Sequence, residues 1–155
     1  MPNLFPTSGG ESSSVPAIQT DGTARSGVKF GRSWRFDYAK GDFVTTPTGK
    51  IADCTDAEAW LEWCKKTIRT ERYTYLAYSR SYGQEYDELI PRGLSRRAIE
   101  SEIVRMTTEA LKTDPRTDRV GPFSFEWDGE RCLFQCELTN VRQQKSRIDG
   151  SVVTS

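Results

Sequence analysis

Apolar residues recur with a helical period in two stretches of the chain. The first stretch follows Thr55, which is placed to cap a helix, and Glu58 three residues later completes a capping-box pattern. Its apolar face consists of Ala57, Trp60, Leu61, Cys64 and Ile68. The second stretch follows Ser95 and carries its apolar stripe at Ile99, Ile103, Met106 and Ala110. These patterns predict two amphipathic helices, and Pro115 requires the second to end at or just before Asp114.

Strand-like alternation flanks these helices on both sides. Trp34, Phe36 and Tyr38 alternate with charged residues, as in a half-buried strand, and a second extended piece follows at residues 43–46. Further on, Asp128-Gly129 is a favoured two-residue turn and predicts a β-hairpin. Folding about this turn places Phe125 opposite Cys132, Phe123 opposite Phe134 and Glu126 opposite Arg131. We therefore predict an α+β fold: a small, mainly antiparallel sheet, built from the first strands and a C-terminal β-hairpin, with two longer helices packed on it.

The composition of the chain changes along its length. Residues 1–32 are rich in Ser, Gly, Pro and Thr, and they bury too little apolar surface to offset their ordering entropy. They are expected to form an arm that is flexible or ordered only by a partner. Residues 33–140 contain the periodic segments and are expected to form a single α+β domain. Residues 141–155 lose the pattern, and we expect a mobile tail there.

Charge and cysteine content narrow the function. The 22 Lys and Arg balance the 22 Asp and Glu, which argues against nucleic acid or an anionic membrane as the main partner. No apolar run reaches the length of a transmembrane helix, and no basic segment followed by an apolar one opens the chain, so we expect assembly in the cytoplasm. Four cysteines without histidine match no zinc template. We therefore expect reduced, buried thiols and neither a metal nor a cofactor.

Few residues are candidates for catalysis. The absence of histidine excludes Ser-His-Asp and Cys-His mechanisms, and no Gly-rich phosphate loop precedes a helix. Glu71 with Asp114, or the acidic run at residues 85–88, would have to supply the carboxylate pair of a glycosidase. Arg72 and Arg116 adjoin the first two and favour their charged form, whereas a general acid must hold a proton. A structural role is therefore favoured over an enzymatic one.

Two short segments carry a resemblance to a known family. The first is Glu71-Arg72, followed by aromatic residues and then by Tyr82-Gly83, and the second is Asp114-Pro115-Arg116 at the end of the second helix. Together they resemble the sheath-initiator family of contractile injection machines, the small baseplate-wedge subunits of myophage tails and tailocins. Asp replaces the family's usual Glu at 114, and the Pro-Gly that usually precedes Glu-Arg is missing. Residues 34–38 and 41–50 look like the branch found in phages of Gram-positive bacteria, and the resemblance covers roughly residues 34–140.

The resemblance implies a structural protein of a bacteriophage or tailocin tail baseplate. Six copies would ring the tube and template the first sheath ring, with tail sheath protein, baseplate wedge proteins and tube or hub proteins as partners. The resemblance also implies that Asp114-Pro115-Arg116 docks onto the helical core bundle of the wedge. Judged from the residues alone, both this triplet and Glu71-Arg72 can instead form salt bridges within the chain, so both interpretations stay open.

The family resemblance also suggests how the first sheath ring attaches. Sheath subunits of such machines link by exchanging extended arms into a neighbour's sheet, so an initiator with an open sheet edge could accept these arms. We expect the hairpin at residues 120–138 to present that edge, with Phe134 and Gln135 as the residues to test. The dense tyrosines at residues 73–86 fit either the core or a contact with a neighbouring subunit.

Two other functions remain as alternatives. One is a tail-associated peptidoglycan-degrading enzyme, because the family has been labelled lysozyme-like. The other is an adaptor that is unrelated to tails.

Overall fold

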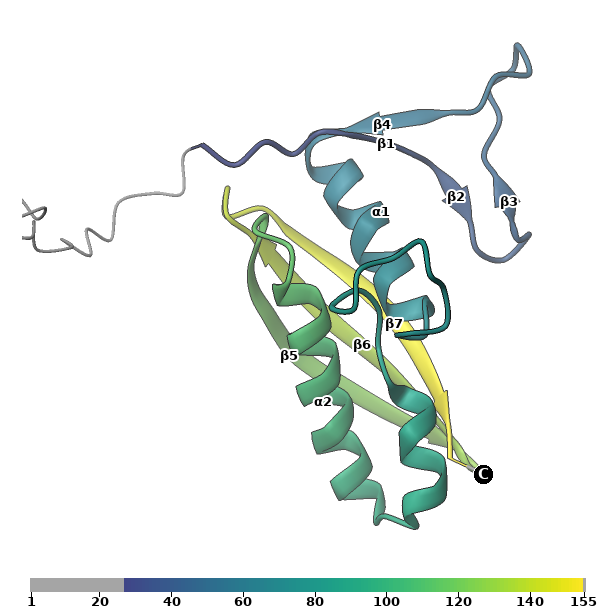
Figure 1. Cartoon of the computed structure of the whole chain (residues 1–155), viewed down its shortest axis with the longest axis vertical. Coiled ribbons are helices and arrows are strands. Elements are labelled where there is room, and N and C mark those ends of the chain that lie inside the picture. Colours follow the sequence, from purple (N-terminus) through teal and green to yellow (C-terminus); the bar gives the residue numbers. More distant parts are fainter. Residues whose placement is uncertain (1–26, 155) are drawn as a thin grey trace, which may run out of the picture.

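The computed structural model describes residues 27–154 of the chain and has an α+β fold, as predicted. Short strands open it: β1 (Arg32–Trp34), β2 (Phe36–Asp37), β3 (Asp42–Phe43) and β4 (Asp53–Thr55). The helices follow: α1 (Asp56–Arg69), the 3₁₀ helix η1 (Tyr86–Arg92) and α2 (Arg96–Lys112). Three long strands close it: β5 (Thr117–Asp128), β6 (Arg131–Asn140) and β7 (Lys145–Val153) (Figure 1).

Both long helices form where the sequence predicts them. Ser95 caps α2, because its hydroxyl oxygen accepts a hydrogen bond from the Ala98 amide at 3.3 Å, and the helix ends two residues before Asp114. In α1, by contrast, the expected capping box is wrong, since Thr55 makes no side-chain cap. Asp56 has a φ of +54°, which takes the chain into the helix from an unusual backbone conformation. Glu58 instead binds Arg35 at 2.6 Å and so ties α1 to the N-terminal strands.

Three antiparallel strands form the main sheet, in the order β5-β6-β7, and both long helices pack on one of its faces. Trp60, Cys64 and Ile68 of α1 join one buried cluster, with Leu138 and Ile148 of the sheet. A second cluster combines residues of α2 with the opposite end of the sheet: Ile99, Ile103 and Met106 with Cys132, Phe134 and Val152. The side chains on the other face, which we call the outer face, are not covered by a helix.

The first strands do not join this sheet, which corrects the prediction that they would. Instead β1 pairs with β4, and β2 pairs with β3, in two separate two-stranded sheets. Figure 1 shows β2 and β3 extending away from the main sheet beyond α1. β2 and β3 are joined by a short turn and pair within the longer loop that β1 and β4 close, and the third place in the main sheet is taken by β7.

Residues 145–153 form strand β7 and are therefore not a mobile tail, contrary to the expectation. Buried Asn140 sets the turn that leads into β7, because its side-chain oxygen accepts hydrogen bonds from the amides of Arg142 (2.9 Å) and Gln144 (3.0 Å). Ile148 and Val152 are buried at a period of two. Gly150 lies between them, and a Cβ there would come within 2.4 Å of the Phe134 ring. This glycine hides the apolar alternation that would have predicted the strand.

The hairpin turn lies one residue later than predicted. Gly129, with a φ of +58°, and Glu130 form the two-residue loop, so Asp128 faces Arg131. Phe125 therefore faces Phe134, Phe123 faces Cys136, and Glu126 faces Leu133. Moving the turn by one residue shifts each partner by two, which leaves every side chain on its predicted face.

The buried core includes a residue that precedes residue 33. Phe30 is buried in the core with Trp60, so this part of the expected N-terminal arm belongs to the domain, while residues 1–26 lie outside the described residues. All four cysteines are buried and free, as expected. Burial raises the pKa of the Cys132 and Cys136 thiols to about 11. Between residues 27 and 154 no helix is long and apolar enough to cross a membrane.

Candidate functional site

The acid-Pro-Arg corner between α2 and β5 is bonded within the chain. The Arg116 Nε lies 3.0 Å from both carboxylate oxygens of Asp114, and another guanidinium nitrogen donates to the Phe30 carbonyl at 2.6 Å. The Asp114 and Arg116 side chains are only 5% and 15% exposed. Of the two interpretations left open by the sequence, the geometry therefore realises the internal salt bridge. Pro115, between them, is exposed.

Arg72 forms a second internal cluster, at the base of the tyrosine-rich segment. It donates to the Gly83 carbonyl at 3.1 Å and reaches Glu109 of α2 at 3.0 Å and Glu85 at 3.3 Å, with its side chain only 8% exposed. Gly83 has a φ of +97°, and a Cβ there would meet the Thr70 carbonyl oxygen at 2.6 Å. The Arg72 cluster therefore closes the loop at residues 72–83 onto α2.

The predicted site residues are therefore divided among separate places. Arg72 and Gly83 contact each other, whereas Glu71 is exposed and forms an isolated β-bridge with Gln84. Asp114 and Arg116 form their own pair just beyond the C-terminal end of α2. The two carboxylates proposed for hydrolysis, Glu71 and Asp114, thus belong to different clusters.

Phe134 and Gln135 cannot offer an open edge, which corrects that expectation. Both lie on β6, the central strand, which is paired with β5 on one side and with β7 on the other. Phe134 is buried in the core, and Gln135 lies on the outer face. The sequence could not identify the central strand, because that assignment depends on β7.

β7 is a regular edge strand. Its nine pairs with β6 run from Arg131–Val153 to Thr139–Lys145 without a register shift. Just beyond the two ends of this pairing, the Thr154 amide donates to the Glu130 carbonyl at 2.9 Å, and the Asn140 amide donates to the Gln144 carbonyl at 3.0 Å. Residues 144 and 154 are thus hydrogen-bonded to their partners, and the even-numbered residues of β7 between them bond to β6 in the same way. Because bonding alternates along an antiparallel pair, the amides of Arg147, Asp149 and Ser151 point away from the sheet. In the described part of the chain, no strand pairs with them.

β5, at the opposite edge, is less regular. Its pairing with β6 shifts twice, once between Thr117 and Arg119 and once between Val120 and Phe123. Pro122, within the second shift, has no amide to donate. Such irregularities discourage the pairing of another strand.

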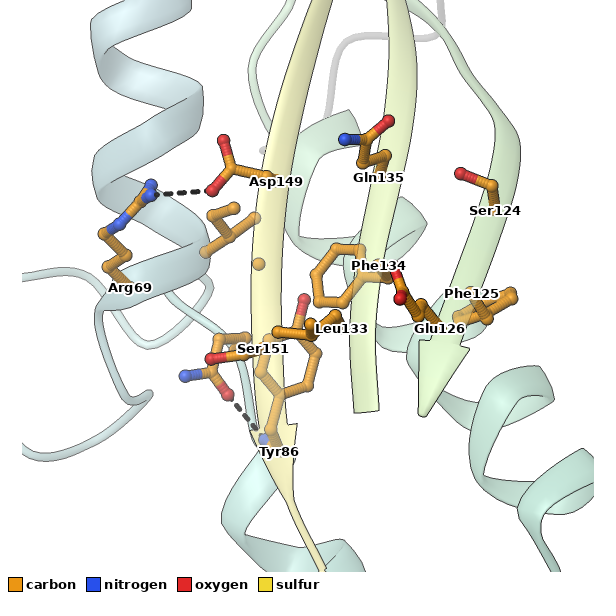
Figure 2. A pocket seen from close by; sticks show the side chains of 13 residues that line it. Arg69, Tyr86, Ser124, Phe125, Glu126, Leu133, Phe134, Gln135, Asp149 and Ser151 are labelled. Atoms are coloured by element: carbon orange, nitrogen blue, oxygen red, sulfur yellow. Dashed lines mark hydrogen bonds and ion pairs between the residues drawn. The ribbon is translucent and has the colours of Figure 1, made fainter. Parts of the chain in front are cut away.

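A cleft of about 770 Å³ gives access to β7. Ser124 and Gln135 line it on the outer face, and Arg69 and Gln84 line it on the helix side of β7. Figure 2 shows Arg69 reaching from α1 to Asp149, where their charged groups lie 3.6 Å apart. Around Gly150 the strand can thus be approached from both faces.

The tyrosines divide between the core and the surface. Tyr86 is buried, and its hydroxyl group bonds to that of Thr107 at 2.6 Å. Tyr73, Tyr75 and Tyr78 are exposed. Of the 11 large hydrophobic residues exposed in the described chain, eight lie at residues 34–51 and 73–78. This concentration marks a surface suited to contact with another polypeptide.

No group of three or more metal-ligating side chains gathers anywhere in residues 27–154.

Residues 32–143 match the family model described as contractile injection system sheath initiator. No curated protein matches the chain. Among solved structures, the chain is similar to a chain of the baseplate of the anti-feeding prophage, determined by cryo-EM with sixfold symmetrisation. That match has a TM-score of 0.50 and 14% sequence identity, and it covers 81% of this chain and 87% of the other. At this identity the likeness concerns the fold alone.

Proposed function

Because the chain belongs to the contractile injection system sheath initiator family, we propose that it starts the sheath by accepting a sheath arm as a fourth strand on β7. Its general role is that of a structural protein of the baseplate. The observation that carries the proposal is the row of outward-facing amides at Arg147, Asp149 and Ser151 on a regular edge strand.

Strand addition suits a protein that must hold an arm firmly. Main-chain hydrogen bonds supply affinity that depends little on the sequence of the arm, while side-chain pockets set its register. An added strand would lie about 4.8 Å from β7, within the cleft that borders Gly150. On the helix side it would meet Ile68 and Gln84, and on the outer face it would run beside Asp149 and Ser151.

The remaining contacts follow from the same role. We propose that the acid-Pro-Arg corner docks on the wedge through its shape, because its charges are used internally and Pro115 is the exposed part. Wedge, sheath and tube or hub proteins would then be the partners of six copies, assembled in the host cytoplasm. We assign no catalytic role, since Asp114 is bound to Arg116 and does not share a cluster with Glu71, and Glu85 of the acidic run is bound to Arg72.

The decisive experiment places proline at the outward-facing positions of β7, as Arg147→Pro and Ser151→Pro. Each change removes one edge donor without removing a bond between β6 and β7. Negative-stain microscopy of particles from a producer strain should show tubes and baseplates without sheath. Arg147→Ala and Ser151→Ala keep the amides, and these matched controls should give sheathed particles.

Incorporation of each variant into particles must be verified with an antibody against the chain. Proline variants that fold, enter the baseplate and still carry a full sheath would contradict strand addition at β7. If sheath is lost in the alanine controls as well, the side chains and not the main chain would carry the contact.

A further inference from the structure

A groove of about 550 Å³ lies between the N-terminal strands, α1 and the tyrosine-rich loop, and we call it the aromatic groove. The N-terminal strands and their turn contribute Trp34, Phe36, Tyr38 and Phe43 to its lining, and the loop contributes Tyr78 and Tyr82. α1 contributes Trp63, Glu62 and Lys66. Its volume is in the range that holds a small ligand or a few residues of a peptide.

Contacts among the rings hold the walls of the groove in place. On one side, Phe36 lies 4.9 Å from Tyr38 and 5.2 Å from Phe43, measured between ring centroids. On the other, Tyr82 lies 4.5 Å from Tyr78 and 5.8 Å from Trp63. The groove is thus built from packed rings, yet Trp34 and Phe43 remain 49% and 44% exposed. Apolar surface of this kind is unfavourable in water and favours a bound partner.

Aromatic-lined grooves bind extended, proline-containing segments, because a proline ring packs flat on an aromatic ring and the segment loses little entropy. The chain contains such a segment in Leu4-Phe5-Pro6, near its amino terminus. This segment has no charged side chain, and the groove lining, with one cation (Lys66) and one anion (Glu62), has no excess of either charge. The chemistry of the groove and of the segment therefore match.

The length of the intervening chain favours the same occupant. Residues 7–26, which are rich in Ser, Gly and Thr, separate Pro6 from Gly27. A Gly- and Ser-rich chain of that length spans about 25 Å on average. Gly27 is nine residues from Phe36 in the groove, so the distance to bridge is at most about 30 Å. A tether whose average length matches the span gives the highest effective concentration, which reaches the millimolar range.

We propose that Leu4-Phe5-Pro6 of the same chain docks in the aromatic groove and covers its exposed rings. The second proline-containing segment, at residues 15–18, fits less well, because the eight residues between it and Gly27 span only about 16 Å on average. The inference is independent of strand addition at β7, since the two surfaces share no residue. Docking would shield the groove in the free protein.

The four tryptophans allow a direct test with the full chain. Trp34 and Trp63 line the groove, whereas the indoles of Trp60 and Trp127 donate to Thr117 (2.9 Å) and Glu100 (2.8 Å) elsewhere. We would record indole N–H resonances of the ¹⁵N-labelled protein and of the triple variant Leu4→Ser, Phe5→Ser, Pro6→Ser. The Trp34 and Trp63 resonances should move, and those of Trp60 and Trp127 should stay in place.

A matched triple variant, Val15→Ser, Pro16→Ser, Ile18→Ser, alters the competing segment and should leave all four resonances unchanged. The shifts caused by the first variant should also not depend on protein concentration, because docking is within one chain. Unchanged Trp34 and Trp63 resonances in the first variant would overturn the proposal and assign the groove to another protein. Shifts that disappear on dilution would overturn it in favour of a second copy, and shifts in the control variant would overturn the choice of segment.

Discussion

Two regions of the molecule use charged and apolar side chains in opposite ways. One is the unit of helices and main sheet, and the other combines the N-terminal strands with the tyrosine-rich loop. In the helix–sheet unit, Asp114 and Arg116 are buried as an ion pair, and Glu109 of α2 binds Arg72 at the base of the tyrosine loop. In the second region, by contrast, Trp34, Phe43 and Leu76 face solvent. Charge therefore supports the architecture, and apolar surface is offered for contact.

This difference reverses the usual interpretation of the charged and aromatic segments in the sequence. Conspicuous charged motifs such as Glu71-Arg72 and Asp114-Pro115-Arg116 suggest docking sites, and a run of aromatic residues suggests a core. Aromatic side chains dominate the contact energy of many protein interfaces, whereas a buried ion pair chiefly fixes geometry. The comparison predicts that removing charge weakens the fold and that removing exposed apolar groups weakens assembly.

The largest effect is expected for Arg116→Ala. The change leaves the buried carboxylate of Asp114 without its partner and removes the bond to the Phe30 carbonyl. Breaking such a pair costs about 3–5 kcal/mol of unfolding free energy, which urea denaturation measures. The exposed Arg119, on β5, provides the control, and Arg119→Ala should change stability by less than about 0.5 kcal/mol. An Arg116→Ala protein of normal stability that fails to enter the baseplate would show that the Arg116 side chain itself contacts a partner.

A smaller effect, dependent on pH, is expected at the boundary of the two regions. Burial, assisted by the charge of Glu62, raises the pKa of Tyr38 from 10.0 to about 12. The unfolded chain loses this proton first, so the stabilisation is complete below pH 10 and is lost as pH rises through about 12. Tyr38→Phe keeps the ring contact with Phe36 but cannot ionise.

Urea denaturation of both proteins below pH 10 and near pH 12 measures the difference. The unfolding free energy of Tyr38→Phe should fall less steeply than that of the parent. Identical slopes would mean that the Tyr38 hydroxyl group is as well hydrated in the folded protein as in the unfolded one.

The smallest effect on stability is expected for Leu76→Ser. Leu76 is fully exposed, so its loss should change the unfolding free energy by less than about 0.5 kcal/mol. Buried Leu89 provides the contrast, and Leu89→Ala should cost about 2–5 kcal/mol. Co-purification with baseplate particles should decline for Leu76→Ser although the protein is fully folded. Full incorporation would show that this part of the loop touches no partner.

The helices were predictable because their signals are local. Ser95 and the stripe from Ile99 to Ala110 lie within one segment, and Pro115 marks where it ends. Pairing between distant segments carries no such signal. Whether β1 joins β4 or the main sheet depends on which strand occupies the third place, and Gly150 concealed that strand.

The sequence identified the residues of the candidate site, but it did not reveal which partners their side chains bind. Arg72 and Arg116 stand out in the sequence, and both prove to be enclosed by partners of the same chain. Their burial depends on how the loop at residues 72–83 and the segment around Phe30 fold back, which single-residue patterns do not reveal. The open edge was missed for the same reason, because no sequence pattern distinguishes β6 from a strand at the edge.

The contact between Gly150 and Phe134 has a consequence for symmetry. Because a Cβ at residue 150 would clash with the Phe134 ring, only one alignment of β7 on β6 is free of collision. A slip by two residues would place Ile148 or Val152 against that ring and move the edge along its axis by about 6.7 Å. In the proposed ring, every copy would therefore offer its edge at the same height, and the arms of the proposed next layer would start level with one another.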